Sequence, residues 1–300
     1  MSSKPATTVT LNPIQPFNFG LSSTIYTRSE IYTHAAFLDG TLYKCIEVEG
    51  KPSLITIREE DGILKALLYG LGGRELLDVT ANWLISSDLD LKVFYSYRDP
   101  MLESIIRRLQ GLKPPRTASV YEALIIAYTE QQISLRVSLA FQERIVKRYG
   151  DKLQHGALTF YSFPTPVALG SVDVNELRGL GLSRNKANYI TELSRSASSG
   201  DVDLESLKTK STAEAREVLL SIRGVGGWTS DYFLFRGLGR TEMVPYDDLG
   251  TQDSVGLYFK CGVRATRGEV REILSRFGNY ARLANYYLIY ARFFGIDPVP

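Results

Sequence analysis

The sequence has few of the residues from which proteins build metal centres. Its 300 residues include only two cysteines, Cys45 and Cys261, which stand far apart, and two histidines, His34 and His155. A zinc or iron–sulfur site usually takes several such ligands at close spacing. We therefore expect no iron–sulfur cluster and no histidine-rich metal site, and we expect both cysteines to be core thiols.

Long apolar runs and a strong charge excess are also missing. No stretch approaches the roughly 20 apolar residues of a membrane helix, and the polar start, MSSKPATTVTLNP, lacks the apolar core of a signal peptide. We therefore expect an intracellular protein, in cytoplasm or nucleoid, with no membrane partner. The net charge is only +2, from 35 basic and 33 acidic residues. A protein of this charge that binds nucleic acid must concentrate its basic groups or use backbone amides.

The first third of the chain has the composition of β-structure. Residues 42–59 alternate apolar and polar side chains on either side of Glu49-Gly50, which predicts a hairpin. Residues 22–34 have a similar content of β-branched and aromatic residues, and residues 75–86 fit either a helix or a short strand. Residues 1–96 are therefore predicted to form a small mixed domain rich in strands.

From Asp99 onward the apolar spacing becomes helical. The spacing and its stop signals predict helices over 99–112, 120–130, 133–150, 183–198 and 281–295. The polar pair Gln131-Gln132 between two apolar helices predicts a break or sharp bend. Two capping-box patterns, Ser211 with Glu214 and Thr266 with Glu269, announce further helices. Residues 97–300 are therefore predicted to be a helical domain, which makes the fold class α+β.

One segment, residues 222–252, combines a glycine hairpin, a helix and a carboxylate. Gly224, Gly226 and Gly227 stand immediately before an apolar-periodic run. This arrangement aims backbone N–H groups and a helix N-terminus outward, which suits a phosphate. Such contacts position a nucleic acid without reading its sequence. From the hairpin alone, an ordinary helix–turn–helix with a glycine connector is the alternative.

The helix after the hairpin carries an aromatic pair. Trp228 and Tyr232 are four residues apart and therefore share one helix face. That face can be part of the core, or it can be one wall of a pocket that stacks an extruded base. Pro245-Tyr246-Asp247 follows the helix, and an acidic group beside such a pocket can stabilise positive charge on a sugar.

These motifs together resemble the helix–hairpin–helix/Gly-Pro-Asp superfamily of DNA glycosylases. Within it they are most similar to the 3-methyladenine DNA glycosylase II branch, whose two upstream helical signatures resemble residues 121–150 and 163–190. The resemblance extends more loosely to residues 16–26. It implies a small N-terminal antiparallel β-rich, TBP-like domain, followed by an all-α helix–hairpin–helix glycosylase bundle with its hairpin at 220–230.

The resemblance also implies a reaction. Asp247, the third residue of the Pro-x-Asp step, matches the catalytic aspartate, and the adjacent Asp248 is then a helix cap or a surface charge. Trp228, Tyr232 and Tyr290 would line the base pocket. Trp228 stands where lyase members carry a nucleophilic lysine, and segment 211–259 contains no lysine. The resemblance therefore implies a monofunctional hydrolase that uses water.

Further residues take roles in DNA binding from the same resemblance. Gln132 would enter the gap left by the flipped base, although a polar residue at a helix end is the simpler interpretation. The resemblance assigns the grip on the DNA backbone to residues of the hairpin and the helix start: Gly224, Val225, Gly226, Gly227 and Thr229. The backbone carbonyls of Leu220, Ile222 and Val225 would hold a structural Na⁺ or K⁺ ion, and no cofactor is required.

One departure from the family pattern concerns the last helix. Relatives place a tryptophan where this chain has Ile289, followed by Tyr290. The preferred lesion is therefore left open. We predict a monomeric enzyme that removes alkylated, 3-methyladenine-like purines from damaged double-stranded DNA. Two alternatives are a bifunctional oxoguanine-type glycosylase/AP lyase, which needs a lysine at position 228, and a non-catalytic helix–hairpin–helix DNA-binding protein, which needs no aspartate after the helix.

Overall fold

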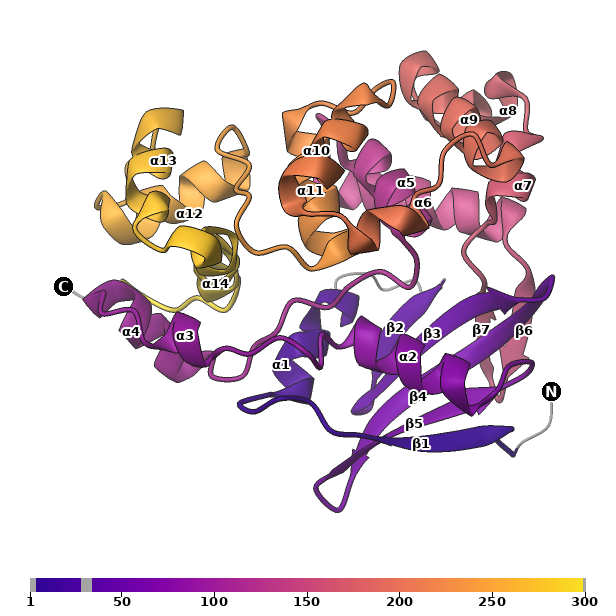
Figure 1. Ribbon diagram of the computed structural model, residues 1–300, viewed down its shortest axis with the longest axis horizontal. Coiled ribbons are helices and arrows are strands. Elements are labelled where there is room, and N and C mark those ends of the chain that lie inside the picture. The colour runs from indigo at the N-terminus through magenta and orange to yellow at the C-terminus, as the bar shows by residue number, and fades with distance from the viewer. Residues whose placement is uncertain (1–3, 28–33, 299–300) are drawn as a thin grey trace.

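The computed structural model describes residues 4–27 and 34–298, and it contains one layer of antiparallel sheet beneath a larger group of helices (Figure 1). The five strands lie in the order β1-β5-β4-β3-β2. Their bounds are β1 (Thr7–Leu11), β2 (Ala35–Leu38), β3 (Thr41–Val48), β4 (Lys51–Glu60) and β5 (Ile63–Tyr69). The α+β fold class is confirmed.

The central hairpin of the sheet forms where it is predicted. Strands β3 and β4 pair from Thr41 with Arg58 to Val48 with Lys51. The two turn residues, Glu49 and Gly50, have φ values of 51° and 75°. Two left-handed residues in a two-residue loop match the right-handed twist of the strands that they join.

Two short elements differ from the strand expected over residues 22–34. Residues 19–27 are helical, as α1 (Phe19–Ser23) and η1 (Thr24–Thr27), so that prediction is wrong for residues 22–27. The reason is local, because the Asn18 side chain caps α1 by accepting the N–H of Leu21. Residues 28–33 lie outside the described residues. The ambiguous segment 75–86 belongs largely to a helix, α2 (Arg74–Leu84), whose buried face packs on the sheet.

The remaining chain is mainly helical, as predicted. Its helices are α3 (Lys92–Tyr95), α4 (Pro100–Arg108), α5 (Val120–Glu130), α6 (Leu135–Tyr149), α7 (Pro166–Gly170), α8 (Val174–Gly179), α9 (Arg184–Ser199), η2 (Glu205–Thr209), α10 (Thr212–Ser221), α11 (Gly227–Leu238), α12 (Leu249–Phe259), α13 (Arg267–Ser275), η3 (Gly278–Tyr280) and α14 (Ala281–Phe293). Both predicted capping boxes form, at the starts of α10 and α13.

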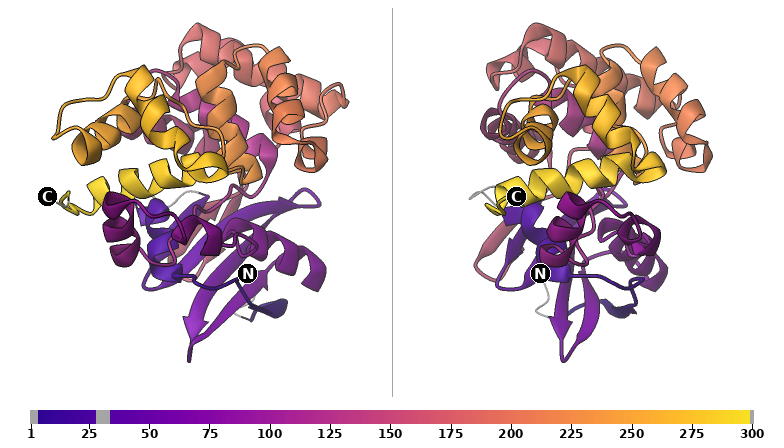
Figure 2. Two further views of the ribbon diagram at one scale, coloured as in Figure 1. Left: turned by 60° about the vertical axis from the view of Figure 1, so that its left-hand side comes forward. Right: turned by 90° about the vertical axis from the view of Figure 1, so that its left-hand side faces the viewer.

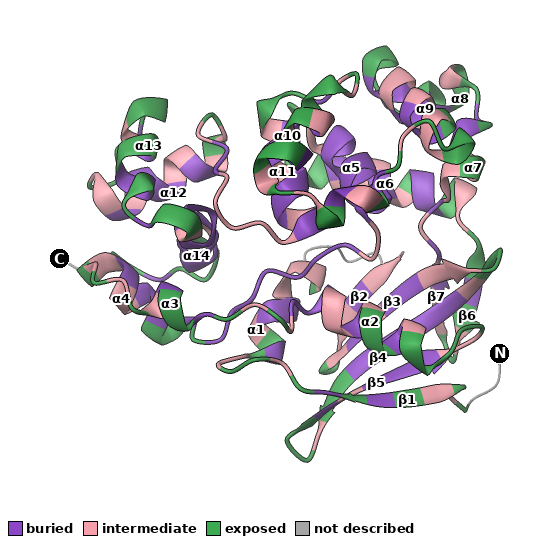
Figure 3. Ribbon diagram, viewed as in Figure 1, coloured by how far each residue is buried: buried purple, intermediate pink, exposed green. Residues whose placement is uncertain are grey.

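The helices are arranged around two apolar cores. One core surrounds α5, which is buried from Val120 to Thr129 (Figure 3) and packs against α9 and α11. The other joins α4 with α12, α13 and α14, the yellow C-terminal helix in Figure 2. The segment between α11 and α12 connects the two cores, and it carries the aspartates of interest.

A β-hairpin links the helices to the sheet. Strands β6 (Lys152–His155) and β7 (Leu158–Tyr161) bury Leu153 and Phe160 against Cys45 and Leu54 of the five-stranded sheet. Cys45 is therefore a core thiol, but Cys261 is exposed, so the prediction is wrong for Cys261, which follows α12 in a turn. The domain boundary between residues 96 and 97 stays a prediction. Within the described residues, no helix is long and apolar enough to cross a membrane.

Candidate DNA-binding and catalytic site

The glycine hairpin joins α10 to α11 and is closed by its own backbone. The N–H of Val225 donates to the carbonyl of Ile222 at 3.0 Å. Gly224 has a φ of 82°, and a Cβ at this position would lie 2.4 Å from the ring of Tyr189. Glycine is therefore required at position 224 for two reasons: the left-handed backbone and the ring packed against it.

Two side chains at the C-terminal end of α5 donate hydrogen bonds to backbone carbonyls of the hairpin. The Tyr128 hydroxyl donates to the carbonyl of Arg223 at 2.8 Å, and the Gln131 side-chain amide donates to the carbonyl of Gly224 at 2.9 Å. On the opposite side, Gly226 and Gly227 are exposed at the start of α11. The first N–H groups of a helix have no intrahelical acceptor, so this end can receive an anion.

The structure brings the expected DNA-binding residues together. They differ in exposure, and exposure decides whether a side chain or only the backbone could contact DNA. Val225 and Thr229 have buried side chains, 7% and 2% exposed, so only their backbone could reach a phosphate. Gln132 is exposed, with a φ of 54°, in the break between α5 and α6. The predicted break at Gln131-Gln132 is confirmed.

The aromatic pair lies just beyond the hairpin. The rings of Trp228 and Tyr232 stack with centroids 5.5 Å apart and an interplanar angle of 29°. Both residues are half-buried, so this helix face is not sealed inside a core. The Tyr232 hydroxyl donates to Glu130 at 3.2 Å, which fixes the ring against the end of α5. A flat aromatic surface that keeps partial access can stack a base.

The two neighbouring aspartates point to different places. Asp248 caps α12: one carboxylate oxygen accepts the N–H of Thr251 at 2.8 Å, and the other accepts the indole N–H of Trp228 at 3.0 Å. The Asp247 side chain is 66% exposed and lies 3.5 Å from the Arg267 guanidinium of α13. The expectation that Asp248 is a helix cap is confirmed. Its second contact, however, places its carboxylate beside the aromatic pair.

Three residues near this pair were not identified from the sequence. Arg236 is an electrostatic neighbour of the hydroxyls of Tyr232 and Tyr26, which come from distant parts of the chain. Burial raises the pKa of Tyr26 to about 12, although Arg236 opposes the shift. Arg282 is buried over the ring of Phe235, and burial lowers its pKa, although nearby Asp248 opposes that shift. Arg236 follows Tyr232 by one helical turn in α11, and this spacing is the only feature of the sequence that could have placed Arg236 near the aromatic pair.

The last helix, α14, carries Tyr290, which was predicted to line the base pocket, and Ile289, which stands where relatives have a tryptophan. Tyr290 is 1% exposed and packs with its ring centroid 4.5 Å from that of Tyr286. Its hydroxyl is an electrostatic neighbour of Tyr26 and Arg236. Ile289 is half-buried. The assignment of Tyr290 to a base pocket stays a prediction.

Of the carbonyls expected to hold a monovalent cation, those of Leu220 and Ile222 lie at the end of α10, and that of Val225 lies in the hairpin before α11. Leu220 belongs to the last turn of α10, and the carbonyl of Ile222 already accepts the turn hydrogen bond from Val225. A helix C-terminus leaves carbonyls without intrahelical donors and carries partial negative charge, which fits a cation. Among the described residues, no group of three or more His, Cys, Asp and Glu side chains could hold a metal ion.

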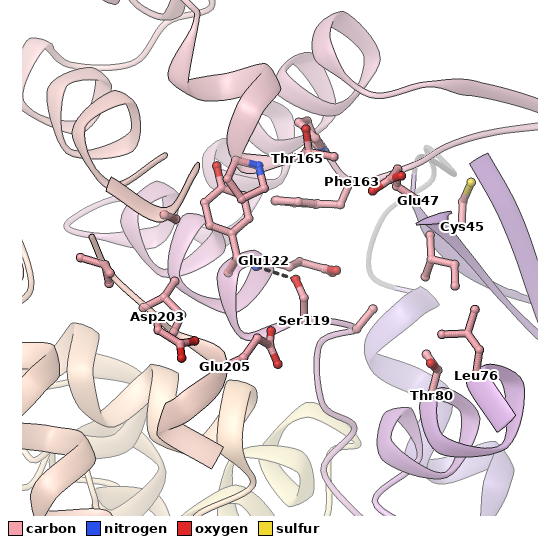
Figure 4. Close-up of a pocket in the computed structure, with 18 of the residues that line it drawn as sticks. Cys45, Glu47, Leu76, Thr80, Ser119, Glu122, Phe163, Thr165, Asp203 and Glu205 are labelled. Atoms are coloured by element: carbon pink, nitrogen blue, oxygen red, sulfur yellow. Dashed lines mark hydrogen bonds between the residues drawn. The ribbon is translucent and has the colours of Figure 1, made fainter. Parts of the chain in front are cut away.

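A separate cavity of about 500 Å³ lies at the other end of α5 (Figure 4). Among the described residues that line it, the charged ones are all acidic: Glu47, Glu122, Asp203 and Glu205. Although burial opposes ionisation, Lys44 at 2.6 Å lowers the pKa of Glu122 to about 2. A cavity with this charge repels phosphate, so it is not part of the candidate DNA-binding site.

Comparisons with known proteins agree on one family. The family described as HhH-GPD superfamily base excision DNA repair protein matches residues 125–279. A DNA-3-methyladenine glycosylase of Bacillus subtilis is 28% identical over 203 residues, 67% of this chain and 67% of that protein. A probable bifunctional transcriptional activator/DNA repair enzyme AlkA of Mycobacterium tuberculosis is 28% identical over 71% of this chain, but only 43% of that protein is covered.

Solved structures extend the similarity to almost the whole chain. The 3-methyladenine DNA-glycosylase from Archaeoglobus fulgidus superposes with a TM-score of 0.83 at 28% identity, covering 97% of this chain and 99% of that one. An 8-oxoguanine glycosylase/lyase of Clostridium acetobutylicum gives a TM-score of 0.73 at 16% identity, with 96% of each chain covered, and shares the fold alone. The N-terminal sheet is therefore part of the shared architecture.

Proposed function

From the premise that this chain belongs to the HhH-GPD superfamily of base excision DNA repair proteins, we propose that it is a monofunctional DNA glycosylase that hydrolyses alkylated purines from damaged double-stranded DNA. Similarity to 3-methyladenine glycosylases along the chain supports this activity. In this proposal the enzyme acts inside the cell as a monomer. It needs no cofactor, and a Na⁺ or K⁺ ion at the hairpin carbonyls would only bridge the protein to a phosphate.

One observation carries the proposal: the Asp248 carboxylate accepts the indole N–H of Trp228 at 3.0 Å. An anion is thereby fixed beside the half-exposed rings of Trp228 and Tyr232. An alkylated purine carries positive charge, so these rings can stack on it favourably. Extrusion of the base into this position costs a few kcal/mol, and less for damaged or mispaired bases.

We assign the chemistry to Asp248 in preference to Asp247. A carboxylate beside the stacked base can stabilise the positive charge that develops on the sugar and can orient the attacking water. The contacts of Asp248 with Thr251 and Trp228 fix it in place for this role. The Asp247 carboxylate lies near Arg267 and mostly in solvent. The match of Asp247 to the family motif remains the competing prediction.

Hydrolysis by water is favoured over lyase chemistry by the residue at position 228. A Schiff-base mechanism needs an uncharged amine beside the sugar, whereas this position holds an indole that donates to Asp248. The first lysine after the hairpin, Lys260, pairs with Glu269 at the far end of α12. The bifunctional alternative therefore lacks a nucleophile at this site.

The test uses the two aspartates as a matched pair. We expect wild-type protein to release a methylated purine from a duplex, with strand scission only after alkali treatment. Asp248→Asn should lower the single-turnover rate by about 100-fold or more, as loss of a charge-stabilising group does, whereas Asp247→Asn should stay within about threefold. The reverse order would return the chemistry to Asp247. Release of 8-oxoguanine with direct strand scission would support the lyase alternative.

A further inference from the structure

Gln131 contacts both sides of the glycine hairpin. It is the C-cap residue of α5, and its side-chain nitrogen donates to the Gly224 carbonyl at 2.9 Å and to the Thr229 hydroxyl at 2.8 Å. Gly224 belongs to the turn, and Thr229 lies in the first turn of α11. A single amide group therefore links the end of α5 to both parts of the phosphate-binding element.

The backbone at Gln131 is fixed from a third direction. Lys186 of α9, only 8% exposed, donates through Nζ to the carbonyls of Thr129 at 2.9 Å and Gln131 at 2.7 Å. These are the carbonyls that the end of α5 leaves without a helical donor. Because the side chain and the carbonyl of Gln131 are both held, the chain can leave α5 in one direction only.

That direction places Gln132 outward. Gln132 adopts a φ of 54°, which costs energy for any residue other than glycine, and its side chain is exposed. Strained backbone of this kind persists where its surroundings determine it. Here the determining contacts come from Gln131 and Lys186 on the preceding side, and from Ser134, the N-cap of α6, on the following side.

We propose that Gln131 is a positioning residue that ties the exposed Gln132 side chain to the glycine hairpin, a role that rests on the proposed function. The hairpin amides bind the DNA backbone, and Gln132 enters the space of the extruded base. If the two are one rigid unit, then binding of the backbone also delivers Gln132 into the duplex. The contribution of Gln131 would then lie in extrusion of the base and not in the chemical step.

The experiment compares two substrates that contain the same methylated purine. In one the lesion is paired in a duplex, and in the other it lies in an unpaired bubble, where extrusion costs little. Gln131→Ala should slow single-turnover release from the paired duplex about tenfold, the effect of losing about 1.4 kcal/mol of hydrogen bonding. Release from the bubble should stay within about twofold of wild type.

A double-mutant cycle tests the route through Gln132. Gln132→Ala alone should slow release from the paired duplex, and adding Gln131→Ala should slow it no further, since coupled residues are not additive. Gln131→Met keeps the side-chain length and lacks the donors, so its rate should match that of Gln131→Ala. It also serves as the test variant if Gln131→Ala does not fold. Gln154→Ala is the matched control, because Gln154 also donates to a glycine carbonyl, that of Gly156 at 3.0 Å, far from this site.

Each outcome decides a different question. Equal slowing on both substrates, or multiplicative effects in the cycle, would overturn the role of Gln131, because a merely structural residue gives that pattern. Failure of wild-type protein to release any methylated purine would instead overturn the proposed function. Slowing confined to the paired duplex, and absent from Gln154→Ala, would support the positioning role.

Discussion

At the scale of residues, the central contact of this protein is the one between an indole and a carboxylate. Trp228 stacks on Tyr232 with one face and donates its N–H to Asp248 with its edge. In the proposed mechanism, this one side chain stacks on the base and also holds the carboxylate of Asp248 in place. The two roles can be separated experimentally, because phenylalanine keeps the ring and loses the donor.

We expect Trp228→Phe to lower the single-turnover rate of base release about tenfold, as loss of one hydrogen bond to a charged group allows. Its affinity for a duplex that contains an abasic-site analogue should stay within about twofold of wild type, because the hairpin contacts are intact. Trp83→Phe is the control: Trp83 also donates through its indole, to the Thr117 carbonyl at 3.0 Å, outside the site. A wild-type rate in Trp228→Phe would show that the hydrogen bond from Trp228 to Asp248 does not contribute to base release.

At the scale of elements, the sequence was sufficient where local rules decide. Apolar spacing predicted α5 to the residue, and two capping boxes marked α10 and α13. Residues 22–27 were assigned to the wrong element because the cap from Asn18 outweighs their β-branched content. The choice between Asp247 and Asp248 depends on where α12 starts and what approaches it from α11. Likewise, Arg236 meets Tyr26 only through tertiary packing, which no local pattern encodes.

The hairpin gives a prediction at the same scale. Gly224→Ala should lower the free energy of unfolding by about 2–3 kcal/mol, since strain at a left-handed residue adds to overlap with the half-buried ring of Tyr189, and it should weaken DNA binding. Gly156→Ala separates the two causes, because Gly156 has a φ of 57° but open space around its Cβ position. It should cost about 1 kcal/mol. Urea unfolding measures both, and equal losses would show that the Tyr189 contact is unimportant.

At the scale of the whole molecule, a buried ion pair joins the sheet to the helices. Lys44 of β3 and Glu122 of α5 are 3% and 4% exposed and lie 2.6 Å apart, and His34 lies 3.4 Å from the same carboxylate. Lys44 lowers the pKa of Glu122 to about 2, well below its ordinary value of 4.5, despite the opposing effect of burial. The interface between the two layers therefore depends on one carboxylate that stays ionised.

This pair predicts how stability varies with pH. A carboxyl group whose pKa is lowered by folding stabilises the native state fully above pH 4.5, and this stabilisation is lost as the pH falls towards 2. Burial lowers the pKa of His34, which acts in the same direction below its ordinary value of 6.5. Glu122→Gln should lower the free energy of unfolding at pH 7 by about 3–5 kcal/mol, because it leaves Lys44 buried without a counter-charge.

Thermal unfolding between pH 3 and pH 7 measures this effect. The wild-type curve should fall steeply with acid, and the Glu122→Gln curve should be flatter and should converge with it at low pH. Glu60→Gln serves as the control, since Glu60 pairs with Arg58 and Lys65 at the surface of the sheet. Parallel curves for wild type and Glu122→Gln would contradict a special role for the buried pair.

The packing of α14 against α4 and the residues around it has a consequence for folding during synthesis. The hydroxyl of Tyr287, in α14, bonds to Tyr95 at 2.7 Å and donates to the carbonyl of Leu112 at 2.8 Å. Residues such as Phe94 and Ile105 can therefore be covered only after α14 has left the ribosome. This apolar surface stays exposed to solvent until α14 has been synthesised, and exposed surface of this kind makes a nascent chain prone to aggregation.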